Sequence, residues 1–346
     1  MRPRATHDIV LASAVLVAIT GLALGVIAIG GHPVLPALAA LLRGSFGSPF
    51  AFFSATLVRA TPLILLGLAV GLAFRAGVLN IGGEGQFHAG ACAAVTVGLA
   101  LGGSLPRPLS ILVTVAAGTA GGALWAGIAA ILKRSFGVLE VISTLMLNFV
   151  AALAVSFLVR GPLQEPTHVY PYTPALNPSL QLPTLAADTR LHIGFLAALG
   201  LAFGLWWVLR TTARGFRLRV VGAGAAAARS AGRVDVTGVV TAAFLASGAI
   251  AGFAGAVEVT GVTHRLFEGI SPGYGYSAIA VALLARLHPL AIIGTGIFFG
   301  ALEAGGAAMQ RDAGVPAQFA LIVEALVVLC VLAIDRLGPR TSEGTQ

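Results

Sequence analysis

Long apolar segments alternate with short polar segments along nearly the whole chain. An α-helix needs about 20 mostly apolar residues to cross a bilayer, because each residue adds about 1.5 Å to its length. We therefore predict about ten transmembrane helices, at residues 9–30, 50–74, 84–103, 109–132, 139–159, 191–210, 237–260, 274–287, 289–310 and 316–335. The eighth segment is short, so we expect that helix to be broken or partly re-entrant. The first is longer than the apolar part of a signal peptide, so we expect it to be retained.

The composition supports a membrane protein. Of the 346 residues, 57% are hydrophobic and only 10% are charged, whereas a soluble domain carries about 25% charged residues. A transmembrane barrel would show short segments of alternating hydrophobicity, and the sequence shows none. The predicted fold class is therefore an all-α polytopic membrane protein, with a single transmembrane domain over residues 1–336 and a short cytoplasmic tail at 337–346.

The basic residues predict the orientation in the cell membrane. With the N-terminus inside, about two thirds of the 21 lysine and arginine residues fall in the inner loops, as the positive-inside rule requires. Both termini are then cytoplasmic, the proline-rich loop 161–190 is outside, and the arginine-rich loop 211–236 is inside. The net charge of +8 comes from short loops and not from one basic run, so we expect a lipid bilayer and no nucleic acid as a partner.

A weak similarity links two parts of the chain. Residues 122–138 read GALWAGIAAILKRSFGV and residues 300–315 read GALEAGGAAMQRDAGV, and each belongs to a predicted helix region that opens on Pro-Leu. The first copy would run from outside to inside and the second in the opposite direction. One interpretation is an inverted repeat, which is common in transporters. The other is a chance match between two segments rich in Gly and Ala.

The sequence GVLNIGGEGQFHAGA, residues 77–91, interrupts two apolar segments. Lipid-facing helices have no need of Asn80, Glu84 and Gln86, and irregular backbone at membrane depth is tolerated only inside protein or beside a water-filled cavity. We therefore expect the break to face the interior of the helix bundle. Two interpretations stay open: a tight turn capped by Asn80, and a direct contact with a transported substrate.

Other polar residues in the apolar segments are further candidates for a substrate pathway. Ser143 and Asn148 lie on the fifth predicted helix and would hydrogen-bond an uncharged ligand without desolvating a charge. Tyr274 follows the flexible sequence SPG, where it would stack on a planar solute or belong to a tight turn. Glu303 lies deep in the ninth predicted helix, and an intramembrane acid is a functional candidate.

The inner loop contains a candidate coupling segment. Residues 225–231 are strong helix formers, and they lie between Gly222 and Gly232 with Ala227 in the middle. Arg229 and Arg233 are four residues apart, so they would share one face of a helix. A short helix lying along the membrane surface is what a cytoplasmic motor protein would push on.

Sequence signatures of catalysis are missing. The chain has no G-x-x-x-x-G-K-[ST] phosphate-binding loop, no H-E-x-x-H and no nucleophile elbow. We therefore expect no catalytic residue, no metal and no cofactor in this chain, and we expect any ATP hydrolysis to take place on a separate subunit.

Five segments together resemble a known family. They are LNIGGEGQFHAGA, RTTARGFRLRVVGAGAAAARSAGR, SGAIAGFAGAVEV, HRLFEGISPGYGYSAIAVALLARLHPL and GALEAGGAAMQRDAGVP, within residues 60–335. In this order they are similar to the permease subunits of ATP-binding-cassette (ABC) importers of type II-like architecture. The branch they resemble most is the nucleoside-type permeases that work with Bmp-type lipoproteins, which are related to ribose-type sugar permeases.

The resemblance implies an assembly. A second permease subunit, identical or different, and cytoplasmic ATPase subunits would complete the transporter, and an extracytoplasmic lipoprotein would deliver a nucleoside or a related sugar-containing solute. Residues Gly222 to Arg233 would form the coupling helix, although the Asn-Pro and Tyr usual in the family are replaced by Gly224-Ala225 and Ser230. The alternative is a secondary transporter or channel that works without an ATPase.

Overall fold

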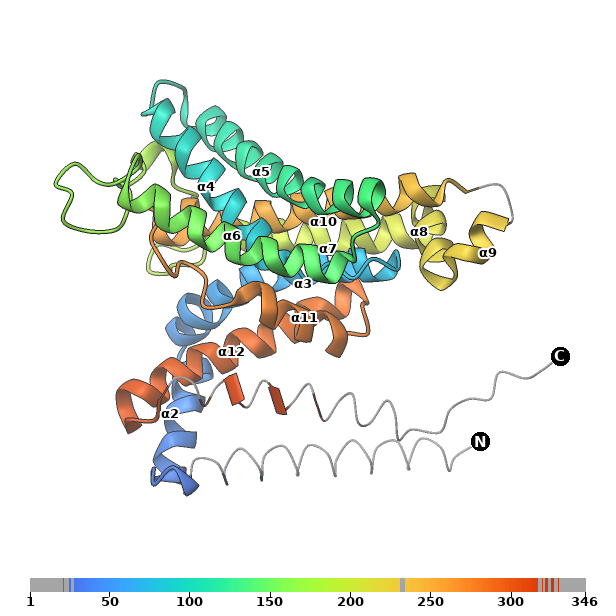
Figure 1. Ribbon diagram of the computed structural model, residues 1–346. Coiled ribbons are helices and arrows are strands. Elements are labelled where there is room, and N and C mark those ends of the chain that lie inside the picture. The colour runs from blue at the N-terminus through green and yellow to red at the C-terminus, as the bar shows by residue number, and fades with distance from the viewer. Residues whose placement is uncertain are drawn as a thin grey trace. The chain divides into compact units, whose positions relative to one another are not determined.

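The computed structural model describes residues 28–230 and 234–316, together with residues 21, 25, 319, 321, 322, 325, 326 and 329. The chain divides into two compact units (Figure 1). The larger unit is Leu57–Gly300, and the smaller unit combines Met1–Thr56 with Ala301–Gln346. The boundaries between the units fall within two helical segments, Ala51–Arg75 and Pro289–Ala313.

The named elements in the described part of the larger unit are all helices. In chain order its helices are α3 (Leu57–Arg75), α4 (Gly83–Leu101), α5 (Arg107–Phe136), α6 (Glu140–Arg160), α7 (Gly194–Thr211), α8 (Ala213–Ala223), α9 (Ala225–Ser230), α10 (Val236–Glu258), α11 (Tyr274–Leu284) and the first half of α12 (Pro289–Ala313). A π-helical turn, Val259–Thr263, extends α10. A 3-10 turn, Pro178–Leu180, lies in the loop before α7.

The smaller unit contains α2 (Val34–Phe46), a π-helical segment (Ala51–Thr56) and the second half of α12 among its described residues. Ala37, Ala40 and Met309 are part of its buried core. Helices α2 and α12 pack closely, since a Cβ added at Gly44 would lie 2.3 Å from the Cβ of Ala308. Residues 33–47, which lie between the first two predicted spans, therefore include a packed helix.

The predicted transmembrane helices are found wherever the structure describes the chain. Six helices in the described residues are long and apolar enough to cross a membrane: Ala51–Arg75, Arg107–Phe136, Glu140–Arg160, Gly194–Thr211, Val236–Thr263 and Pro289–Ala313. Helix α4 covers the third predicted span, and the short α11 covers the eighth. The first and tenth predicted spans lie mostly outside the described residues. The prediction of an all-α polytopic membrane protein is confirmed.

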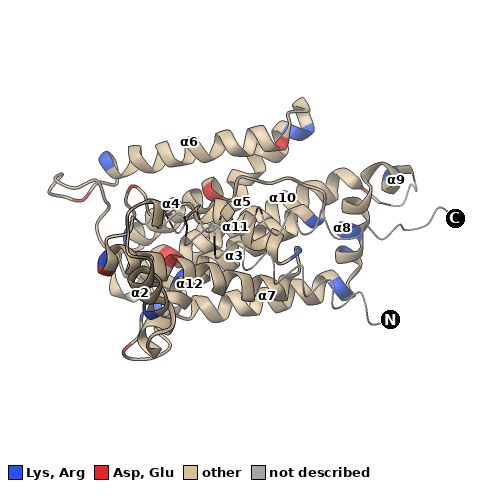
Figure 2. Ribbon diagram, turned by 90° about the horizontal axis from the view of Figure 1, so that it is seen from below, with Lys and Arg blue, Asp and Glu red and all other residues tan. Residues whose placement is uncertain are grey.

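Helix α3 forms the centre of the larger unit. Every side chain from Leu57 to Ala73 except Arg59 is buried, which is typical of a helix that is apolar on all sides. Helices α4, α5 and α10 pack together through glycines. A Cβ added at Gly252 would lie 2.4 Å from the backbone oxygen of Gly118, so only glycine permits this approach. Helix α6 contrasts with α3, because it lies along the edge of the unit (Figure 2) and exposes large apolar side chains such as Phe149.

Basic residues gather at one end of the larger unit (Figure 2). This is the end where α3, α5 and α7 finish, where α6 and α10 begin, and where α8 and α9 lie. The described lysines and arginines at this end are Arg75, Lys133, Arg134, Arg210, Arg214, Arg217, Arg219, Arg229 and Arg286. Fewer lie at the other end: Arg59, Arg107, Arg160, Arg190 and Arg265. The asymmetry supports the predicted orientation, while the side on which the two termini lie is still a prediction.

The loop 161–190 is extended and is held by backbone hydrogen bonds. Its helical content is the single 3-10 turn Pro178–Leu180. Backbone hydrogen bonds tie it to the segment after α10: Thr173 N donates to Leu266 O (2.9 Å), and Leu176 N donates to His264 O (2.8 Å). These bonds hold the loop against the segment after α10, at the end of the unit opposite α8 and α9.

The order of the elements agrees with an inverted repeat without proving one. Helices α5 and α12 carry the two similar sequences, and Pro108 and Pro289 stand in their first turns. Each follows a helix that begins at a glycine-rich break, α4 at Gly83 and α11 after Gly273.

Candidate functional site

The break between α3 and α4 starts with a helix-ending motif. Gly77 has a positive φ of 73°. The amide of Gly77 donates to Phe74 O and that of Val78 to Ala73 O, both at 3.0 Å. This is a Schellman arrangement, which satisfies the last carbonyl groups of a helix and requires a left-handed residue. Helix α3 therefore ends here for a reason that is local to the sequence.

Asn80 organises the rest of the break. Its Oδ1 accepts hydrogen bonds from Gly82 N (2.9 Å) and from Gln86 Nε2 (3.0 Å). Its Nδ2 donates to Gln86 Oε1 (3.1 Å) and to Ser247 Oγ on α10 (2.9 Å). Both amide groups are buried. Asn80 thus uses its whole hydrogen-bonding capacity inside the protein, in a turn that it caps, as in one of the two interpretations of the sequence.

Asn148 on α6 binds the same break from the other side. Its Oδ1 accepts from Gly85 N (2.8 Å), and its Nδ2 donates to Ile81 O (3.0 Å). Thr144, one turn earlier on α6, accepts a hydrogen bond from Ile81 N (3.3 Å). The side chain of Asn148 also reaches the hydroxyl of Tyr276 on α11, at 3.4 Å. The break is therefore fixed to α6, α10 and α11 by buried polar groups.

Glu84 lies where two helices begin. It stands in the first turn of α4, and its Oε2 accepts a hydrogen bond from Gly275 N (2.7 Å) in the first turn of α11. A Cβ at Gly275 would lie only 2.2 Å from Glu84 N, so the two helix starts are in direct contact. The N-terminus of a helix carries a partial positive charge, so this buried carboxylate is stabilised by two helix ends. The Nδ1 atom of His88 is 4.0 Å from Glu84 Oε1.

Measured along the helices, these contacts lie about half a hydrocarbon thickness from the arginine-rich end of the unit. Ser247 is eleven residues into α10 from Val236, or about 16 Å at 1.5 Å per residue. Gly275 is nine residues from the other end of α11 at Leu284, or about 14 Å. Half of a hydrocarbon core of about 30 Å is about 15 Å. Helices α4 and α11 therefore begin at mid-depth, which is where transporters built from broken helices place their substrate sites.

Large exposed side chains lie on both α6 and α11, Tyr276 of α11 next to Asn148 and the others on the outer face of α6, away from its buried Asn148. On α6, Met146 and Phe149 are 50% and 57% exposed, and on α11 Tyr276 is 42% exposed. Tyr274, by contrast, is buried, with its ring centroid 6.2 Å from that of Phe87. The exposed Tyr276 beside the buried amides suits a planar, uncharged solute that needs both stacking and a hydrogen bond.

Of the candidate coupling segment, Gly222 to Arg233, the structure describes the end of α8 and the whole of α9. Gly222 on α8 lies against the end of α3, since a Cβ there would lie 2.0 Å from Arg75 O. Ala228 on α9 is buried with Val221 and Val236. Ala227 and Arg229 on the same short helix are exposed. The segment is therefore anchored on one side and open on the other.

A family model described as "Branched-chain amino acid transport system / permease component" matches residues 52–332. The chain belongs to this permease family. Among its relatives, the glucose ABC transporter permease protein TsgB13 of Haloferax volcanii is 37% identical over 81% of this chain and 75% of its own length. The guanosine ABC transporter permease protein NupP of Bacillus subtilis is 34% identical over 90% of both chains. The guanosine permease NupQ of the same species is 31% identical over 71% of this chain and 78% of its own. The protein is thus an ABC importer permease, as its sequence motifs implied.

The permease brings together some of the predicted site residues and not others. Asn80, Glu84, Gln86 and Asn148 belong to one connected network. Ser143 is buried and its hydroxyl bonds to carbonyl groups of its own helix, Leu139 O and Glu140 O. Glu303 is half-buried in the smaller unit. Gly232 and Arg233 lie outside the described residues, so the predicted pairing of Arg229 with Arg233 on one face is untested.

Sequence reasoning missed Ser247, which completes the network. It also placed Tyr274 in the pathway, whereas Tyr276 is the exposed tyrosine. Ser247 interrupts a run of small apolar residues within a predicted span, which is a weak signal in the sequence. The orientation of the two tyrosines depends on where α11 begins, which the left-handed Gly273 (φ 103°) fixes.

Proposed function

We propose that this permease forms the translocation pathway of an ABC importer for nucleosides or related sugar-containing solutes. The observation that carries the proposal is the meeting of two helix starts, held by a buried amide network with the exposed Tyr276 beside it. A nucleobase would stack on an exposed aromatic side chain, and the hydroxyl of Tyr276, which lies beside the network, would hydrogen-bond to the solute. The guanosine permeases among the relatives support nucleosides, and the glucose permease keeps sugars as the second candidate.

The proposal includes the partners. An ATPase subunit would dock on α9 from the cytoplasm and hydrolyse ATP, and the exposed Ala227 and Arg229 would contact it. A second permease subunit, the same or different, would face the exposed side of α6 and close the pathway. An extracytoplasmic lipoprotein would deliver the solute to the end of the unit covered by loop 161–190. Residues 1–336 would act as one permease domain with both termini in the cytoplasm. Membership of an ABC permease family favours this assembly over a transporter that works without an ATPase.

A short route connects the proposed docking site to the proposed substrate site. Gly222 contacts the carbonyl of Arg75 and lies next to Gly77, whose added Cβ would be 3.3 Å from Gly222 Cα. Gly77 starts the break that leads to Asn80 and Glu84. A displacement of α8 by the ATPase would therefore reach the mid-depth network through a few residues of irregular backbone. In this mechanism the break moves as a unit, because Asn80 holds it together.

The experiment that tests the proposal measures uptake by the complete transporter in proteoliposomes. We expect guanosine uptake to fall at least about fivefold in Phe149→Ala, because a lost aromatic contact is worth about 1 kcal/mol or more. Phe203→Ala on α7 is the matched control, because Phe203 is 55% exposed against 57% for Phe149. Equal uptake in both variants would remove the α6 face from the pathway. Glucose uptake without nucleoside uptake would replace the substrate class.

A further inference from the structure

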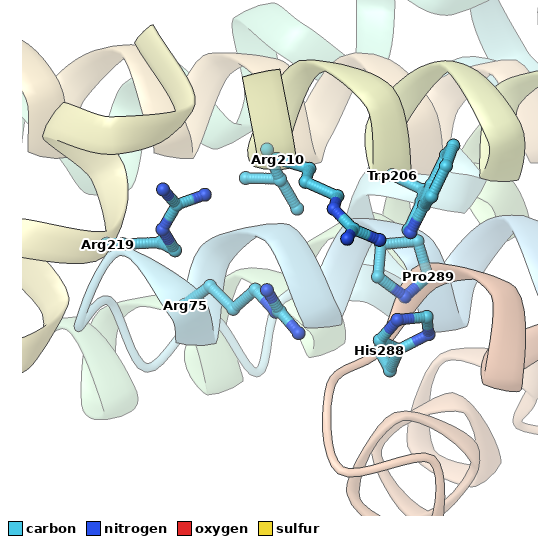
Figure 3. A pocket seen from close by; sticks show the side chains of 7 residues that line it. Arg75, Trp206, Arg210, Arg219, His288 and Pro289 are labelled. Carbon is cyan, nitrogen blue, oxygen red and sulfur yellow. The ribbon is translucent and has the colours of Figure 1, made fainter. Parts of the chain in front are cut away.

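A pocket of about 170 Å³ opens at the arginine-rich end of the larger unit (Figure 3). It lies where α3 and α7 end, where α8 passes and where α12 begins. The residues that line it are Arg75, Trp206, Leu209, Arg210, Arg219, His288 and Pro289. Neither the mid-depth network nor the exposed face of α9 shares any of them.

The lining contains three guanidinium groups and no carboxylate. Within the part of the chain that the structure describes, none of the three arginines takes part in an ion pair with an acidic side chain. Grouped cations repel one another unless an anion lies among them. The pocket therefore has the charge of an anion site.

The groups that line the pocket are held in place. The Nε atom of Arg75 donates to Leu287 O (2.8 Å), which leaves its terminal N–H groups for a ligand. The guanidinium of Arg210 lies over the Trp206 ring, 5.6 Å from the centroid. Arg286 and Leu287 both have positive φ, 49° and 58°, a conformation that non-glycine residues adopt mainly where the surroundings enforce it.

The ends of three helices change the positive charge of the pocket. The N-terminus of α12 begins at Pro289 in the lining, and its partial positive charge favours an anion. Arg75 and Arg210 are in the last turns of α3 and α7, whose carbonyl ends offset part of their charge. Arg219 is in the middle of α8 and has no such compensation. The excess of positive charge remains.

We propose that this pocket binds the phosphate group of an anionic membrane phospholipid. The planar guanidinium fork makes paired hydrogen bonds to phosphate oxygens. The pocket is open and large enough to admit a phosphate group. The position at the end of membrane-crossing helices, with Trp206 in the wall and Trp207 exposed beside it, is typical of the headgroup level. The arginine-rich end also faces the leaflet that attracts basic pockets to acidic lipids.

A bound headgroup would join α3, α7, α8 and α12 at one point. Arg219 lies three residues before Gly222, the residue that touches the end of α3. The lipid would therefore hold α8 in its place against the break, so anionic lipid would strengthen the junction through which α8 and α3 are connected.

The test measures binding of phosphatidylglycerol and of phosphatidylcholine with the same acyl chains to the intact purified permease by native mass spectrometry. Arg210→Gln combined with Arg219→Gln should weaken phosphatidylglycerol binding about tenfold, as expected for lost charged hydrogen bonds, and leave phosphatidylcholine binding unchanged. Arg214→Gln combined with Arg217→Gln is the control, because it removes the same charge from exposed positions of α8 outside the pocket. Arg75 is kept, since it also supports Leu287.

Three results would overturn the proposal. Equal loss of phosphatidylglycerol binding in both double variants would mean that the lipid responds to overall charge alone. Binding of millimolar inorganic phosphate that depends on Arg210 and Arg219, without any preference for phosphatidylglycerol, would show a free anion instead of a lipid. Loss of the ATPase subunit from the complex in the pocket variant, with lipid binding intact, would assign the arginines to a protein partner.

Discussion

At mid-depth in the larger unit the polar side chains satisfy one another, whereas near α8 and α9 the charged side chains have no such partners. Asn80 and Gln86 exchange hydrogen bonds with each other, Asn80 also donates to Ser247, and Asn148 bonds to the backbone of the break. Arg219 and Arg229 have no acidic partner among the described residues. The polar groups of the first region find their partners within this chain. The charged groups of the second region are available to bind other molecules.

The two regions should therefore respond differently to mutation. A buried polar group that loses its partner costs about 1–3 kcal/mol, so changes in the network should lower stability and transport together. Exposed charges contribute little to stability, so changes on α9 should alter transport while the fold stays intact. Gly222 makes a close backbone contact with α3 and also belongs to the coupling segment. A change at Gly222 should therefore affect both stability and transport.

The largest effect is expected for Asn80→Leu. The change leaves Gly82 N and the amide of Gln86 without their partners in a buried site. We expect a loss of about 3 kcal/mol or more in the free energy of unfolding and no measurable uptake. Thermal unfolding in detergent checks the first and proteoliposome uptake the second. Thr119→Val is the control, because it removes a hydroxyl that bonds only to its own helix at Val115 O. Wild-type stability in Asn80→Leu would mean that the amide pair does not hold the break.

The second largest effect is expected for Gly222→Ala. The new methyl group would lie 2.0 Å from Arg75 O, which is backbone and cannot rotate away. Helix α8 must then move from the end of α3, so we expect uptake to fall more than about tenfold, a barrier change of about 1.4 kcal/mol, with a smaller loss of stability than in Asn80→Leu. Gly204→Ala on α7 has open space at its Cβ and should behave as the wild type. If uptake is unchanged in Gly222→Ala, this junction is not on the coupling route.

The sequence predicted the parts of this molecule that depend on local patterns. Spans followed from apolar length, the capped turn at Asn80 from a polar residue among glycines, and α9 from an alanine-rich stretch between glycines. Helix α8 was not predicted, because Gly215 and Gly222 lower its helix propensity and only the cap at Thr212 marks its start. The bond from Asn80 to Ser247 joins residues 167 positions apart, and the contact of Glu84 with Gly275 depends on how two helices meet. Such contacts are set by packing, which no local pattern encodes.

A smaller effect on stability, but a specific effect on transport, is expected for Ala227→Asp. Ala227 is exposed on α9, so the variant should fold normally. A new carboxylate in a closed interface stays unpaired and costs a few kcal/mol of binding, so we expect ATP hydrolysis without uptake, or loss of the ATPase from the complex. Ala213→Asp adds the same charge at an exposed position at the start of α8 and should leave both activities intact. Normal uptake with normal substrate-stimulated hydrolysis in Ala227→Asp would exclude α9 as the docking element.

The smallest effect is expected for His192, which lies just before α7. This residue shows how a buried polar group with an unpaired atom changes stability with pH. Its Nδ1 accepts a hydrogen bond from Gly194 N (3.2 Å), and its buried Nε2 has no partner among the described residues. Burial, together with the nearby His264, lowers the pKa of His192 to about 4. A neutral imidazole is therefore favoured in the fold.

The sign of the pH dependence follows from this lowered pKa. The unfolded chain binds a proton on His192 as the pH falls below about 6.5, whereas the folded chain binds it only near pH 4. The stability from His192 is present at pH 7 and is lost as the pH falls through this window. We expect the melting temperature to drop by a few degrees between pH 7 and pH 4.5, and His192→Asn, which keeps an acceptor for Gly194 N, to show a shallower drop. Parallel pH profiles for the two proteins would assign the acid sensitivity to other groups, while a flat profile in the wild type would contradict the buried neutral imidazole itself.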